Sequence, residues 1–243
     1  SRYELVVIPS RVGSGAESSM TSIVNSPAKK LIEVDSRLVP DTVIYDLDLF
    51  STLSPHDLYF ASLDAITHLI ESNNSFLCNQ YVEFLSSSSL KRFFNVISGE
   101  DFSQPSKKLL TELCLLSFNG GLAQNNAGAG LCHSLSHSAE ITLCLSHLEA
   151  IRLFLKPSLN FLKKYFADSY PLFDAELTGK IYEYIDCADC SENLKKPIDI
   201  FLSEQQLQEI INAAPTDPCW KLMKNRVDKE NLFGFLKGEY EIN

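Results

Sequence analysis

The fold is decided by residues 55–72, which read PHDLYFASLDAITHLIES. The apolar positions that recur at helical spacing in this stretch are Leu58, Ala61, Ala65, Leu69 and Ile70. Downstream of it strand signals become scarce, and helical periodicity returns over 76–97, 108–124, 130–145, 147–166, 173–186 and 204–213. We therefore expect an all-helical domain over residues 53–243.

The residues before this helix have a different pattern. YELVVI at 3–8 predicts a short buried strand, VIY at 43–45 predicts a second strand, and small residues at 10–19 predict a turn. Two strands cannot cover both faces of a parallel sheet. We therefore interpret residues 1–52 as the C-terminal part of a doubly wound α/β domain whose front half is absent from this chain.

The composition excludes several classes of protein. Of the 243 residues, 45% are hydrophobic and 21% are charged, as is typical of a globular protein. The 31 acidic and 21 basic residues give a net charge of -10, and basic residues cluster only as short pairs, so we expect no nucleic-acid partner. No apolar run reaches the ~20 residues that span a bilayer, and we expect no membrane association. The seven cysteines are an odd number, which argues against a complete framework of disulfide bonds. The start of the sequence lacks the charged, apolar and small-residue segments of a secretory signal. Both observations favour a cytoplasmic protein.

Four of the five histidines lie in patterns suited to metal binding. Asp64 and His68 are four residues apart, as are His133 and His137, and each pair lies on one face of an expected helix. His147 adds a further imidazole. Nitrogen and oxygen donors of this kind suit a divalent first-row ion. The same residues can also be hydrogen-bonded core histidines, and spacing alone leaves both interpretations open.

Several segments, in one order along the chain, resemble motifs of the iron-containing (group III) alcohol dehydrogenases, of the dehydroquinate synthase-like superfamily. PSRVGSGAE at 9–17 resembles the PTTxGTGSE segment of that family, PDTVIYD at 40–46 its following strand, and TLSP at 52–55 its TLP segment. SLDAITHLIES at 62–72 resembles its DAxxHxxE helix, and GLCHSLSH at 130–137 its second histidine helix. The resemblance runs from Ser1 nearly to the C-terminus and implies a dehydroquinate synthase-like fold, in which residues 1–52 end a Rossmann-like dinucleotide-binding domain.

The resemblance also implies roles for individual residues. The expected ligands of Fe²⁺ or Zn²⁺ are Asp64, His68, His133 and His147. His137 would be the catalytic residue beside the metal and the nicotinamide. The residues expected to contact NAD or NADP are Ser10, Arg11, Gly13, Ser14 and Gly15. The implied protein is a homodimer that interconverts an alcohol and an aldehyde or ketone by hydride transfer, with a small-molecule alcohol or carbonyl compound as its substrate.

Departures from the family pattern keep alternatives open. Ser10 and Arg11 replace two threonines, and Arg11 would suit a phosphate or the carboxylate of a sugar acid. Residues 133–140 and 147–151 also resemble segments of dehydroquinate synthase, so a sugar-phosphate cyclase is a second hypothesis. The missing GGGS phosphate-binding turn supports a third, a non-catalytic truncated relative that acts as a binding module.

Overall fold

The structure is a computed structural model that describes residues 3–25, 30–167, 173–190 and 202–242. Within these ranges the chain forms a long helical part preceded by a short segment that contains the strands. This confirms the expected fold class. The boundary between residues 52 and 53 stays a prediction.

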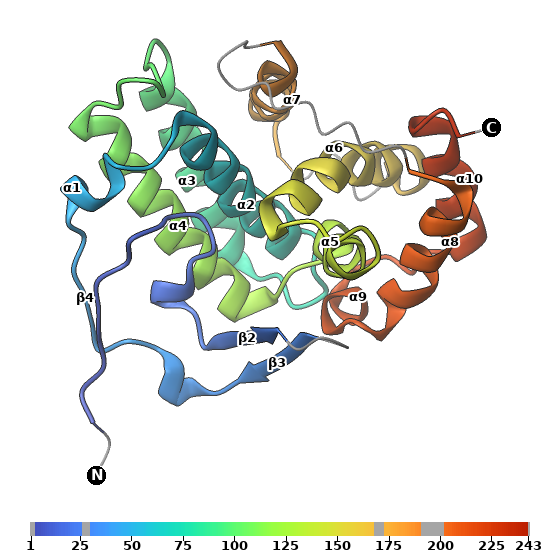
Figure 1. The fold of residues 1–243 in the computed structure, drawn as a ribbon, viewed down its shortest axis with the longest axis horizontal. Helices are drawn as coiled ribbons and strands as arrows, with labels where there is room; N and C mark the ends of the chain where they lie inside the picture. Colours follow the sequence, from blue (N-terminus) through green and yellow to red (C-terminus); the bar gives the residue numbers. More distant parts are fainter. Residues whose placement is uncertain (1–2, 26–29, 168–172, 191–201, 243) are drawn as a thin grey trace.

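Helix α2 (Pro55–Asn73) is the centre of the molecule. Ser54 caps it, because its hydroxyl accepts a hydrogen bond from the amide of Asp57. Every residue from Leu58 to Ser72 is buried, and a helix buried on all sides must have neighbours all round. Those neighbours are α3 (Gln80–Ile97), α4 (Lys107–Ala127), α5 (Leu131–Thr142) and α6 (His147–Tyr165). Figure 1 shows α2 between α3 and α4 on one side and α5 and α6 on the other.

The remaining helices cover the ends of this bundle. Helix α7 (Ala175–Cys190) packs on α3. Helices α8 (Glu204–Ala213) and α9 (Pro218–Leu222) contact α5, and α10 (Lys229–Glu239) contacts α6 and α8. The sequence analysis did not predict α9, α10 or the short α1 (Leu47–Phe50). No helix in the described ranges combines the length and the apolar character that a membrane crossing needs.

The N-terminal segment forms two small sheets. Strand β1 (Val6–Val7) pairs in parallel with β4 (Thr42–Val43), and β2 (Thr21–Asn25) pairs antiparallel with β3 (Lys30–Val34). The expected buried strand at 3–8 is wrong in length and burial. Only two of its residues pair, and Val6 is 48% exposed, because β4 is its one sheet neighbour in the described part of the chain.

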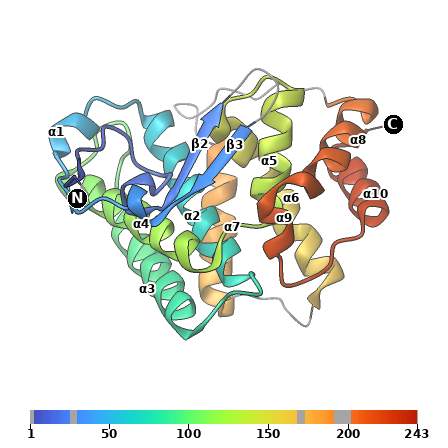
Figure 2. The same ribbon diagram turned by 90° about the horizontal axis from the view of Figure 1, so that it is seen from below.

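The β2–β3 hairpin was also missed. It lies where the C-terminal end of α4 meets α5 and α9, and Figure 2 shows it crossing that face of the helices. Strands β2 and β3 form one wall of a pocket beside α5.

Candidate metal centre

The predicted ligands come from three helices and meet at one carboxylate. Asp64 and His68 lie on α2, His133 lies on α5, and His147 is the first residue of α6. From Asp64 Oδ1 the Nε2 atom of His133 is 3.4 Å away, that of His147 is 3.5 Å away and that of His68 is 3.9 Å away. Asp64, His68 and His133 are at most 3% exposed, so these donors converge inside the protein.

These distances are too long for charged hydrogen bonds and suit an ion between the donors. A charge-assisted N–H···O bond is about 2.7–2.9 Å long. In contrast, donors at about 2.1 Å from one tetrahedral ion lie roughly 3.4 Å from each other. Asp64 Oδ1, His133 Nε2 and His68 Nδ1 are buried and make no hydrogen bond. Buried polar atoms nearly always have partners, so this group fits a bound cation.

The tightest part of the group consists of Asp64, His133 and His147, whose ligand atoms all lie within 4.8 Å of one another. His68 stands slightly apart, and its ring stacks on that of His133 with centroids 4.5 Å apart. The structure therefore brings all four predicted ligands together.

Carboxylates orient two of the imidazoles. His133 Nδ1 lies 2.6 Å from Glu71 Oε2, and His147 Nδ1 lies 2.8 Å from Glu140 Oε1. An Nδ1–H group that donates to a carboxylate leaves the lone pair on Nε2, and both Nε2 atoms face Asp64. Metal-binding histidines in proteins are held in this way.

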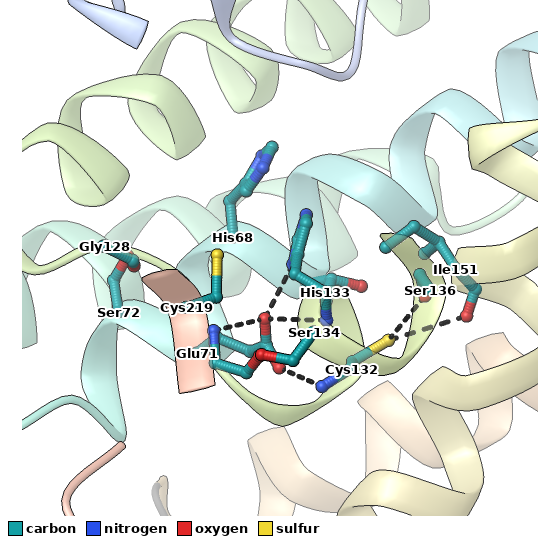
Figure 3. A network of polar contacts seen from close by, with 12 residues as sticks. His68, Glu71, Ser72, Gly128, Cys132, His133, Ser134, Ser136, Ile151 and Cys219 are labelled. Carbon is teal, nitrogen blue, oxygen red and sulfur yellow. Dashed lines mark hydrogen bonds and ion pairs between the residues drawn. The ribbon is translucent and has the colours of Figure 1, made fainter. Parts of the chain in front are cut away.

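Glu71 also caps the N-terminus of helix α5. Its carboxylate accepts hydrogen bonds from the amides of Gly130 (2.8 Å) and Cys132 (2.5 Å), in place of a side-chain cap on α5. Figure 3 shows Glu71 between Cys132 and the His133 ring. One side chain of α2 therefore fixes both the start of α5 and the direction of a ligand.

The pKa values follow from burial and these contacts. Burial acts to raise the pKa of Asp64, but the neighbouring imidazoles hold it well below its ordinary value. Burial lowers the pKa of His68 to about 3. Burial opposes the charge on His133 as well, but the neighbouring carboxylates of Asp64 and Glu71 raise its pKa to about 10. A proton on His133 and a metal ion therefore compete for the same nitrogen.

His137 lies one turn after His133 on α5 and has a different carboxylate. Its Nδ1 atom is 2.8 Å from Asp217 Oδ2, and its ring packs on those of His133 and His147 with centroids 5.8 and 5.5 Å apart. His137 also lines a pocket of about 230 Å³. The remaining lining residues are Met20, Thr21, Ile23, Val34, Leu77, Gln124, Asn125, Asn126, Gly128, Ala129, Pro218, Cys219 and Leu222.

The predicted cofactor loop is fixed to α4 by its glycines. The amides of Gly13 and Gly15 donate to Ser117 Oγ at 2.8 and 3.2 Å, so they face the interior rather than a cofactor. Gly15 has a φ of 64°, and a Cβ there would lie 2.4 Å from the Gly121 amide nitrogen, so only glycine fits. This corrects the expectation that these amides approach the nucleotide.

Three cofactor candidates on this loop remain accessible. Ser10, Arg11 and Ser14 are exposed on the outer side of the same loop. Their contact with the nucleotide stays a prediction.

Sequence reasoning missed the carboxylates behind the imidazoles. Glu71 and Glu140 lie inside the motifs already quoted, and Glu71 follows His68 by three residues on the same helix, which is a usable signal. Asp217 is 80 residues from His137 and precedes Pro218, which indicates only a helix start.

Comparisons with known proteins point in one direction. No family model matches the chain. It is 24% identical over 186 residues to the probable alcohol dehydrogenase EutG of Salmonella typhimurium, covering 74% of this chain and 46% of that protein. It is 23% identical over 173 residues to the NADPH-dependent butanol dehydrogenase of Clostridium saccharobutylicum, covering 70% and 44%. The chain thus spans about half the length of these relatives.

Solved structures share the fold. The iron-containing alcohol dehydrogenase of Thermococcus thioreducens matches with a TM-score of 0.82 and 20% identity, covering 98% of this chain and 65% of that one. Maleylacetate reductase from Rhizobium sp. strain MTP-10005 matches with a TM-score of 0.81 and 19% identity, covering 98% and 67%. Together with the sequence relatives, these matches confirm the resemblance to the iron-containing dehydrogenases.

Proposed function

We propose that this chain, which is related in sequence to alcohol dehydrogenases and shares the fold of the iron-containing ones, forms the metal-binding part of an alcohol:NAD(P) oxidoreductase. The observation that carries the proposal is the buried Asp64 Oδ1 atom, which faces three imidazole nitrogens at 3.4–3.9 Å without a hydrogen bond. Asp64, His68, His133 and His147 would hold Fe²⁺ or Zn²⁺. Both ions accept this mixture of nitrogen and oxygen donors.

In the proposed reaction the metal ion and the nicotinamide would supply part of the chemistry, and the side chains of this chain would supply the rest. When bound, the ion polarises the substrate oxygen and the nicotinamide exchanges a hydride with the substrate carbon. His137 lies beside the ligand cluster and on the pocket wall. In the oxidation direction the hydroxyl proton passes to His137 while the C–H electron pair leaves as hydride, so that a C=O bond forms. Asp64 and His133 are buried, so the candidate ligands themselves are shielded from water.

The remaining functional predictions rest on the resemblance. Ser10, Arg11 and Ser14 are proposed to contact the nucleotide, and the active protein is proposed to be a cytoplasmic homodimer. The butanol dehydrogenase relative is named for NADPH, and the choice between NAD and NADP in this chain is left to experiment. The comparisons give no support to a sugar-phosphate cyclase or to a non-catalytic binding module.

Metal content tests the proposal most directly. The purified chain is expected to retain about one equivalent of iron or zinc by elemental analysis. His133→Ala should lose it, because Nε2 of His133 faces Asp64. His56→Ala is the matched control, because the His56 ring contacts the Phe60 ring at the start of α2, outside the ligand cluster. Unchanged metal content in His133→Ala would show that the site is misassigned.

The reaction is tested separately. Reduction of a panel of aldehydes with NADH or NADPH should be visible as loss of nicotinamide absorbance, and His137→Ala should slow it while metal is retained. Metal retention without turnover under either nucleotide would favour the binding module over the oxidoreductase.

A further inference from the structure

His137 is held from behind by a carboxylate that is itself fixed at two points. Asp217 Oδ2 lies 2.8 Å from His137 Nδ1, and Asp217 Oδ1 accepts a hydrogen bond from the Cys219 amide at 2.8 Å. The second bond makes Asp217 the N-cap of α9. The two side chains are 7% and 11% exposed, so the pair is largely shielded from water. The direction of the Asp217 carboxylate is therefore set by backbone geometry.

His137 borders the pocket, and Asp217 does not. His137, Pro218 and Cys219 line the pocket, whereas Asp217 is not among its lining residues. The other walls come from the hairpin through Ile23 and from α9 through Leu222. A group in the pocket can therefore contact His137, and Asp217 can influence that group only through the imidazole.

His137 differs from its neighbour His133, although both rings have a carboxylate at Nδ1. The Nε2 atom of His133 faces Asp64 at 3.4 Å and belongs to the ion site. The His137 ring borders the pocket. A carboxylate at Nδ1 therefore orients both rings, of which one belongs to the proposed ion site and the other borders the pocket.

We propose that Asp217 is a positioning residue, which holds His137 in the Nδ1–H tautomer and presents Nε2 to the hydroxyl group of an alcohol in the pocket. This rests on the proposed function. A donating Nδ1–H group places the lone pair on Nε2, and only that lone pair can accept the hydroxyl proton. When the proton arrives, the carboxylate stabilises the imidazolium without moving.

An Asn at position 217 separates the two roles of the side chain. Its carbonyl oxygen can still cap α9, but its amide then faces His137 as a donor and favours the Nε2–H tautomer. Asp228 provides a matched control. It caps α10 by accepting a hydrogen bond from the Asn231 amide at 2.9 Å, which repeats the capping role on another helix.

The tautomer is measured without any turnover. ¹⁵N-histidine NMR of the Zn²⁺-loaded chain, with the His137 signals assigned by their loss in His137→Gln, should show Nδ1–H in the wild type and in Asp228→Asn. Asp217→Asn should show Nε2–H. An Nε2–H tautomer in the wild type overturns the proposal, and so does an unchanged tautomer in Asp217→Asn. The wild-type spectrum decides the matter even if the variant does not fold.

Kinetics gives the second measurement. Asp217→Asn should lower kcat by about 10²- to 10⁴-fold with metal content retained, since one proton-transfer group would be wrongly presented. Added formate should restore part of the rate in Asp217→Gly, because it can replace the missing carboxylate. A rate in Asp217→Asn equal to that of Asp228→Asn would overturn the proposal. A wild type without turnover would contradict the oxidoreductase but leave the NMR result decisive for Asp217.

Discussion

Glu17 and Asp64 are both buried carboxylates, 4% and 1% exposed, but their surroundings differ. Glu17 accepts hydrogen bonds from Tyr45 at 2.9 Å and from Ser117 at 2.8 Å. Asp64 Oδ1 has imidazole nitrogens only at 3.4 Å and beyond, and no hydrogen bond. Hydrogen-bond donors at a carboxylate offset the cost of its burial, whereas a buried carboxylate oxygen without a donor suits a ligand of a cation. The first carboxylate therefore belongs to the scaffold and the second to the site.

The largest effect should come from replacing Asp64 and Glu17 with alanine, each in its own variant. Asp64→Ala removes the atom on which three imidazoles converge, and metal affinity should fall by more than about 100-fold, beyond the loss caused by an outer partner of a ligand. Glu17→Ala should retain the metal and lose about 1–3 kcal/mol of unfolding free energy, because Tyr45 and Ser117 lose their acceptor. Elemental analysis and urea denaturation measure both. Equal metal loss in the two variants would remove the distinction between them.

A methyl group added between the loop and α4 by Gly121→Ala should lower the free energy of unfolding by about 3 kcal/mol. In Gly121→Ala the new Cβ would lie 2.2 Å from Gly15 O and 2.3 Å from Ser18 Oγ, so the loop must move away from the helix. Gly234→Ala is the control, because nothing lies within 4 Å of that position in α10. The control should gain about 0.5–1 kcal/mol from helix propensity. A tolerated Gly121→Ala would contradict the close approach of the loop.

Ser117→Ala should cost about 2 kcal/mol of unfolding free energy. Its hydroxyl accepts from Gly13 and Gly15 and donates to Glu17, so three buried groups lose a partner at once. Thr111→Ala on the same helix removes an exposed hydroxyl that bonds to the Lys107 carbonyl, and it should change stability by less than about 0.5 kcal/mol. Similar losses in the two variants would mean that the Glu17 cluster is not a scaffold element.

The last effect concerns pH and has opposite signs for metal binding and for the stability of the metal-free chain. The pKa of His133 is raised to about 10 in the metal-free fold, above its ordinary value of 6.5. Its contribution to the stability of the metal-free chain is therefore complete below pH 6.5 and is lost as the pH rises toward 10. Metal affinity should rise over the same range, by about tenfold per pH unit, because the ion displaces that proton. Chelator competition and urea denaturation at several pH values test the two signs, and parallel trends would contradict the shared nitrogen.

The sequence indicated which candidate ligands to look for, because their spacing along the chain is a local property. Asp64 and His68 lie one helical turn apart. An i,i+4 pair lies on one face of its helix however that helix packs on its neighbours. The partners of the ligands are not local. Asp217 reaches His137 only because α9 packs on α5, which no pattern of residues announces.

The strand-containing segment was harder to predict. TSIVN at 21–25 and KLIEV at 30–34 are short, and no Asn-Gly or Asp-Gly turn joins them. The apolar run at 3–8 indicated burial, but its burial depends on what covers it rather than on its composition. The glycines of the loop were identified as a turn, whereas their contact with α4 requires Gly121, 106 residues after Gly15 and without any local signal.

Glu71 joins two properties that natural variation usually changes separately. The same carboxylate that orients the His133 ring also caps the N-terminus of α5 through the amides of Gly130 and Cys132. A substitution at Glu71 would therefore change the orientation of His133 and the N-terminal cap of α5 at the same time. A second mutation would have to restore both contacts to compensate for it. This structural role favours conservation of the glutamate even in homologues that have lost catalytic activity. Conservation of this residue alone would therefore be weak evidence that a homologue is active.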